Sequence, residues 1–145
     1  MKKCLIVFAS VLLVVLIASC SLFGKPDYVG TWTVTLGTAP AAVVVTMDFT
    51  KSDFEVTVDS PVDDYVVTGD LAESDTENAL DATIIGISKN TVALTAAEIT
   101  GFLTLNTLTA AQTLTYTVTG ETITVAGAML TALTGQSTLT ATLVP

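Results

Sequence analysis

The sequence predicts an all-β domain, an antiparallel meander of about eight strands that forms a closed or nearly closed barrel. From Tyr28 onward, apolar residues alternate with polar ones, mostly Thr, at the period of a half-buried strand. Gly, Pro, Asn and Asp interrupt this alternation at short intervals, which indicates tight links between neighbouring strands. An open sheet would leave two exposed edges, and closing a barrel or pairing two sheets hides them.

Four alternating segments account for the first half of the domain. In each one the apolar residues share one face, while Thr, Asp or Glu share the other, as expected where one face meets the core and one meets water. The β-branched Thr suits the outer face because it tolerates the extended backbone. The segments are residues 31–36, 43–50, 53–59 and 65–71, with turn residues at 37–40 and 59–61.

The second half of the domain continues the pattern after a polar, acidic loop at 73–81. Gly120 and Glu121 fit a two-residue hairpin turn with Gly at its first central position. The apolar piece 128–133 is consistent with a helical turn before the next strand. The predicted strands here are residues 84–87, 113–119, 122–125 and 138–143.

One stretch departs from period two and predicts a short inserted helix over about 96–105. Residues 95–98 fit a capping box, with Thr at the N-cap and Glu at the third helical position. Ile99, Phe102 and Leu103 then share one helical face.

The N-terminus is expected to direct the chain to the cell envelope. Two Lys residues precede an apolar run from Leu5 to Ile17, which is shorter than the ~20 residues of a spanning helix. The run ends in Ile17-Ala18-Ser19-Cys20, which resembles the lipobox of bacterial lipoproteins. In that family the signal peptide is cut before the Cys, the thiol carries a diacylglycerol, and the new amino group is usually acylated.

The lipobox resemblance implies three regions: a removed signal peptide at 1–19, a lipidated Cys20 with its tether to residue 27, and a single domain at 28–145. The membrane would then be a partner through the lipid on Cys20. Asp after the Cys retains lipoproteins in the inner membrane of enteric bacteria, so Ser21 favours the outer membrane. The alternatives are an ordinary secretory signal with a coincidental Cys and an uncleaved anchor.

Gly30-Thr31-Trp32, at the start of the first predicted strand, resembles the G-x-W signature of lipocalins and other calycins. In those proteins the Trp closes the base of an up-and-down barrel around an apolar cavity. The resemblance implies a lipocalin-like barrel. Lipocalins usually set an Arg from a late strand against this Trp, and the present chain contains no Arg.

The composition excludes several classes of function. The chain has no His, and its two Cys both belong to the signal and lipobox region. A Ser-His-Asp triad, a Cys-His pair and a His- or thiolate-bound metal are therefore excluded. Five basic residues against fourteen acidic ones leave no electrostatic basis for binding nucleic acid. We predict no catalytic residue, no cofactor and no metal ligand.

Two acidic groups remain as candidates for chemistry, around residues 59–64 and within 73–81. They are expected to be solvated loops that keep an exported protein soluble. Weak Ca²⁺ binding and a hydrolase that uses two carboxylates are the alternatives. A hydrolase would require two acidic side chains roughly 5–10 Å apart in one cleft.

The expected function is that of a non-enzymatic, membrane-anchored lipoprotein that binds a small apolar ligand or an envelope partner. Ile99 and Phe102 are candidates for contact with the ligand from a helical lid, and Tyr116 for a hydroxyl inside the pocket. The alternative is a structural or surface-interaction protein without a ligand cavity, in which the helix plugs the barrel and Tyr116 is core. Large inward residues would favour this alternative, whereas small ones, such as Gly69, Ala82, Gly86 and Ala141, would leave room.

Overall fold

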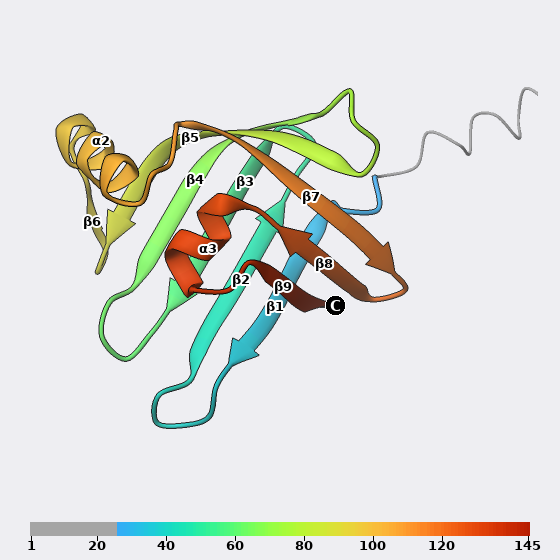
Figure 1. Ribbon diagram of the computed structural model, residues 1–145. Coiled ribbons are helices and arrows are strands. Elements are labelled where there is room, and N and C mark those ends of the chain that lie inside the picture. Colours follow the sequence, from blue (N-terminus) through green and yellow to red (C-terminus); the bar gives the residue numbers. More distant parts are fainter. Residues whose placement is uncertain (1–25) are drawn as a thin grey trace, which may run out of the picture.

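The computed structural model describes residues 26–145, which form a closed β-barrel of eight antiparallel strands with two short helices (Figure 1). The predicted signal peptide at 1–19 and the predicted lipid site at Cys20 lie outside the described residues. The predicted all-β class, the barrel and the inserted helix at 96–105 are confirmed.

The strands follow an up-and-down order around the barrel. The barrel strands are β1 (Gly30–Leu36), β2 (Val43–Phe49), β3 (Asp53–Asp59), β4 (Tyr65–Glu73), β5 (Ala79–Lys89), β7 (Ala111–Thr119), β8 (Thr122–Ala126) and β9 (Thr138–Leu143). Each of these strands pairs with the next one in this list, and β9 pairs with β1, which closes the barrel. A two-residue strand, β6 (Val92–Ala93), pairs with the end of β5.

The largest departure from the predicted strand boundaries lies at the acidic loop. Strand β5 begins at Ala79, inside the predicted acidic loop, and β4 extends to Glu73. The loop between them is therefore only residues 74–78, because the pairing of β4 with β5 continues past the apolar residues that marked each strand. The short strand β6 has no alternating pattern of its own, and the sequence did not predict it.

Both helices have local causes. In α2 (Ala96–Leu105), the Thr95 backbone N–H donates to Glu98 Oε2 at 2.8 Å and the Glu98 N–H donates to Thr95 Oγ1 at 3.4 Å, so the predicted capping box is present. Helix α3 (Ala128–Thr134) ends at Gly135, whose φ of +74° is left-handed.

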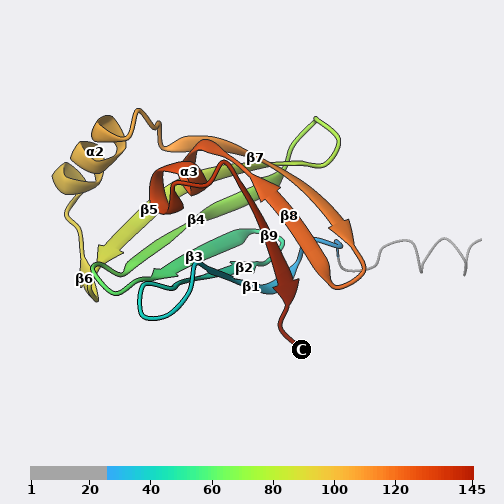
Figure 2. The same ribbon diagram turned by 60° about the horizontal axis from the view of Figure 1, so that its bottom comes forward.

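The helices lie at the end of the barrel opposite the point where the described chain begins (Figures 1 and 2). Helix α3 connects β8 to β9, and its buried Met129 and Leu130 belong to the apolar core. Helix α2 lies farther out, beside the start of β4 and the end of β5. We call this the helix end and the opposite one the N-terminal end.

The N-terminal end is built around Trp32. Its side chain is 1% exposed, and its indole N–H donates to the carbonyl oxygen of Tyr28 at 2.9 Å. Leu143 of β9 is its partner in register, and a Cβ on Gly30 would lie 2.8 Å from a Leu143 methyl group. Leu143 and the Tyr28 carbonyl thus hold the Trp in a chain that has no Arg.

A continuous apolar cluster occupies the interior. Among residues 26–145, every side chain classed as buried is apolar or aromatic. Removing such side chains from water is the main stabilising contribution available to a domain without a disulfide. The largest fully buried side chains are Trp32, Tyr28, Phe49, Met47, Leu80, Leu114, Ile123, Met129, Leu130, Leu139, Val45 and Val56.

A β-bulge interrupts the pairing of β4 with β5. Thr68 faces Gly86 and Gly69 faces Ile84, so Ile85 has no partner in β4. Gly69 is required at this point because a Cβ there would clash with the Thr83 carbonyl and lie 2.7 Å from the Phe54 ring.

A pair of glycine substitutions tests the bulge. Gly69→Ala should lower the free energy of unfolding by roughly 1–3 kcal/mol, since the new methyl group meets backbone that cannot yield cheaply. Gly101→Ala is the matched control: no atom lies within 4 Å of the added Cβ, and a helical Ala should raise stability by about 0.5–1 kcal/mol. Urea denaturation of both variants measures this, and equal effects would contradict the described bulge.

Candidate functional site

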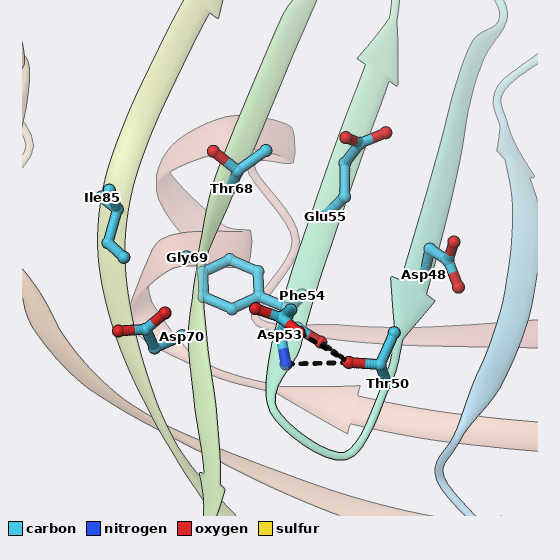
Figure 3. Close-up of a pocket in the computed structure, with 9 residues that line it drawn as sticks. All are labelled: Asp48, Thr50, Asp53, Phe54, Glu55, Thr68, Gly69, Asp70 and Ile85. Carbon is cyan, nitrogen blue, oxygen red and sulfur yellow. Dashed lines mark hydrogen bonds between the residues drawn. The ribbon is translucent and has the colours of Figure 1, made fainter.

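A hollow of about 380 Å³ lies on the outer wall of the barrel (Figure 3). Strands β2 to β5 and the β2–β3 turn supply its lining. We call it the acidic hollow, because four of its residues carry carboxylates. It is lined by Asp48, Thr50, Asp53, Phe54, Glu55, Thr68, Gly69, Asp70 and Ile85.

The strand alternation places the carboxylates on the outer wall. In β3, Phe54, Val56 and Val58 are buried in the core, so Asp53 and Glu55 point outward. The pairing then sets acid against acid: Asp48 of β2 faces Glu55, and Asp53 faces Asp70 of β4.

These two pairs carry like charge across neighbouring strands. Residues directly opposite have Cβ atoms about 4.5–5.5 Å apart, and like charges in that arrangement are destabilising. The only ion pair within residues 26–145 lies elsewhere, between Lys89 Nζ and Asp63 at 2.7 Å. No Lys lines the acidic hollow, so neutral donors provide the local contacts of its acids.

Hydroxyl groups hold two of the four acids. Asp53 Oδ2 accepts from Ser52 Oγ at 2.5 Å and from Thr50 Oγ1 at 3.2 Å. Asp48 Oδ1 accepts from Thr31 Oγ1 at 3.3 Å. These bonds orient the two carboxylates.

The hollow also has an apolar part. Ile85 points outward, where its side chain is 60% exposed among the acids, while neighbouring Ile84 and Ile87 are buried. The bulge leaves Ile85 without a partner in β4. Phe54 lies against Gly69 between the two acidic pairs (Figure 3). The arrangement offers negative charge around an exposed aliphatic side chain.

The structure places the three predicted ligand residues in two separate regions. Ile99 and Phe102, both half-buried, lie on α2 against the core, and the Phe102 ring centroid is 5.9 Å from that of Tyr65. Tyr116 lies toward the N-terminal end, its centroid 5.4 Å from that of Tyr28. The helix and Tyr116 therefore do not share a pocket, and a ligand-binding role for each stays a prediction.

Burial dominates the environment of the two packed tyrosines. It raises the pKa of both Tyr28 and Tyr116, with smaller increases from the negative charges of Glu73 and Asp27. A tyrosine hydroxyl is already neutral near pH 7, and the raised pKa extends that neutral range to more alkaline pH, as burial of an aromatic side chain predicts.

The four small residues that the sequence analysis named are buried or lie close to neighbouring atoms. The Phe54 ring occupies the space beside Gly69, and Ala82 and Ala141 are buried in the core cluster. A Cβ on Gly86 would lie 2.7 Å from the Thr68 hydroxyl. This side chain lines the acidic hollow, so Gly86 borders the outer wall there.

Within residues 26–145, no three His, Cys, Asp or Glu side chains form a group that could hold a metal ion. None of the helices in this part of the chain is long and apolar enough to span a membrane.

The chain was compared with protein-family models, with curated proteins and with solved structures. None of these comparisons finds a match.

The sequence analysis did not identify the acidic hollow. Its signal was present in part, since the alternation already places Asp48, Glu55 and Asp70 on outward faces. That Asp48 faces Glu55 depends on strand register, which the turn between β2 and β3 sets. Ile84 and Ile87 are both buried, three residues apart, only because of the bulge, so the apolar residues at 84, 85 and 87 do not reveal from sequence that Ile85 faces outward.

Proposed function

We propose that the protein is a non-enzymatic, lipid-anchored envelope lipoprotein whose lipocalin-like barrel binds an envelope partner on its outer wall. The observation that carries the proposal is the contrast between the two faces of the sheet. The inner face is occupied by a continuous apolar cluster, whereas the outer face has the shaped, charged hollow. This contrast favours a partner outside the barrel over a small apolar ligand within it.

The lipobox at Ile17 to Cys20 supports the anchor, and Ser21 favours the outer membrane by analogy with other lipoproteins. A lipid on Cys20 would hold the N-terminal end of the barrel nearer the bilayer, since the described chain begins at that end (Figure 1). The negatively charged domain would be repelled by an anionic bilayer surface. The outer wall would then stay open to partners in the envelope.

The environment of the hollow favours binding over hydrolysis. Its four acids include pairs close enough to suggest the two carboxylates of a glycosidase. A general acid of that kind needs burial or a similar environment to keep its proton at neutral pH. Asp48, Asp53, Glu55 and Asp70 are instead all exposed to water.

The anchor is tested with two cysteine variants. Cys20→Ser should abolish incorporation of radiolabelled palmitate, because the thiol and amino group that carry the lipid belong to residue 20 of the lipobox. Cys4→Ser is the matched control and should keep the label, since Cys4 lies in the predicted signal peptide. A Cys20→Ser protein that is still labelled would contradict the anchor.

Partner binding is tested by photo-crosslinking in intact cells, with a photoreactive residue in place of Thr68 in the hollow. Thr117, an exposed outward residue of β7, is the control position. We expect a discrete protein adduct from position 68 and none of the same mass from position 117. The same adducts from both positions, or no adduct from 68, would contradict a partner on this wall.

A further inference from the structure

We infer that residues 90–110 form a strap that opens as one unit while the barrel stays folded, and that a latch at its first turn holds it closed. The strap contains β6, α2 and the links around them, and it leaves the barrel between β5 and β7 (Figure 1). The inference is independent of the proposed function. It combines a weakly attached helix, left-handed backbone at both ends of the strap, and the contacts of the latch.

Few side chains attach α2 to the barrel. Leu103 is its most buried residue, at 9% exposure, while Ile99 and Phe102 are only half-buried. Helix α3, by contrast, has two side chains that are at most 1% exposed. Because hydrophobic stabilisation follows the apolar area removed from water, α2 is held to the barrel less tightly than α3.

Helix α2 would not persist after leaving the barrel. It has ten residues, and isolated helices of that length are marginal in water. Gly101 in its interior weakens it further, since Gly is a poor helix former. Detachment and unfolding of α2 are therefore one event, which is the behaviour expected of a local opening unit.

The backbone is left-handed at both ends of the strap. Thr91, in the turn between β5 and β6, has a φ of +69°, and Thr107, just after α2, has a φ of +53°. A β-branched residue is strained in this region and stays there only where its surroundings hold it. Opening would release the strain at both ends, which favours opening of the whole strap over fraying of one end.

Lys89 and Asn90 form the latch that holds the first of these turns. Asn90 Nδ2 donates to Asp63 Oδ1 at 3.1 Å, and Asn90 Oδ1 accepts from the Asp64 N–H at 2.8 Å. The Asn90 N–H donates to the Asp64 carbonyl oxygen at 2.8 Å. Lys89 Nζ lies 2.7 Å from Asp63 Oδ2. The latch thus fixes the strained turn to the loop between β3 and β4.

Lys89 also connects the latch to the helix. Its Nζ lies 5.5 Å from the centroid of the Tyr65 ring, within the range of a cation–π interaction. The Tyr65 ring in turn packs against Phe102 of α2, with 5.9 Å between the centroids. Loss of the Lys89 charge would therefore loosen both the turn and the ring that supports the helix.

The closed strap covers an edge of the sheet. Strand β5 pairs with β7 only from Ala79 to Thr83, and beyond that point the strap takes over through β6. The Leu94 N–H also donates to the Ile87 carbonyl oxygen at 2.8 Å. Opening would leave unpaired N–H and C=O groups along this part of β5, and such an edge can pair with another chain.

The test is amide hydrogen exchange of the ¹⁵N-labelled mature protein in detergent micelles, followed by NMR. The amides of Leu94 and Ile99 report on the strap, and those of Met47 and Ile123 report on the barrel. We expect both strap amides to exchange at least about tenfold faster than the barrel amides, because a local opening needs less free energy than global unfolding.

Two substitutions should move the strap amides in opposite directions. Lys89→Met keeps the apolar stem and removes the charge, so both strap amides should exchange about threefold faster. Thr107→Gly should slow both by about threefold, since Gly adopts left-handed backbone without strain. Lys51→Met removes the same charge from the β2–β3 turn and is the matched control, expected to change these rates by less than about 1.5-fold. Retained signals of Met47 and Ile123 would show that each variant folds.

Three results would overturn the inference. Strap amides that exchange as slowly as the barrel amides would show that the strap opens only with the whole domain. A Leu94 amide that does not respond to Thr107→Gly would show that α2 frays alone, because these residues lie at opposite ends of the strap. Equal effects of Lys89→Met and Lys51→Met would show that Lys89 is not part of a latch.

Discussion

The barrel wall is a single sheet with apolar side chains on its inner face and polar ones on its outer face, and the rest of the structure depends on that division. The wall curves until β9 meets β1, so no long edge remains exposed. Thr serves most outward positions and keeps them neutral. Against that background the two pairs of facing acids in the hollow are a local departure, which strand register produces.

Both ends of the barrel are closed from within. Trp32, held by the Tyr28 carbonyl and by Leu143, fills the N-terminal end, and Met129 and Leu130 of α3 fill the helix end. The G-x-W resemblance correctly predicted a buried Trp in the first strand. The apolar cavity that the same resemblance implied stays a prediction, and the interior holds one continuous cluster of buried apolar side chains.

Much of the fold was predictable because it is encoded locally. Alternation predicted seven of the eight barrel strands, the apolar run at 84–87 predicted part of β5, and the capping box at Thr95 and Glu98 predicted the start of α2. What the sequence could not reveal depends on pairing between distant residues. The strand start at Ala79 and the bulge at Ile85 arise from contact with β4. For the same reason, Phe102 and Tyr116 could not be assigned to different ends of the barrel until the strands were placed.

The central claim is that the protein binds on its outer wall and not inside its barrel. A titration of the ¹⁵N-labelled mature protein with palmitate, followed by NMR, tests it most directly. The account predicts that palmitate leaves the amide signals of the inward residues unchanged. Saturable shifts of Val56, Leu80 and Ile123 with palmitate would contradict it, because these side chains form the interior.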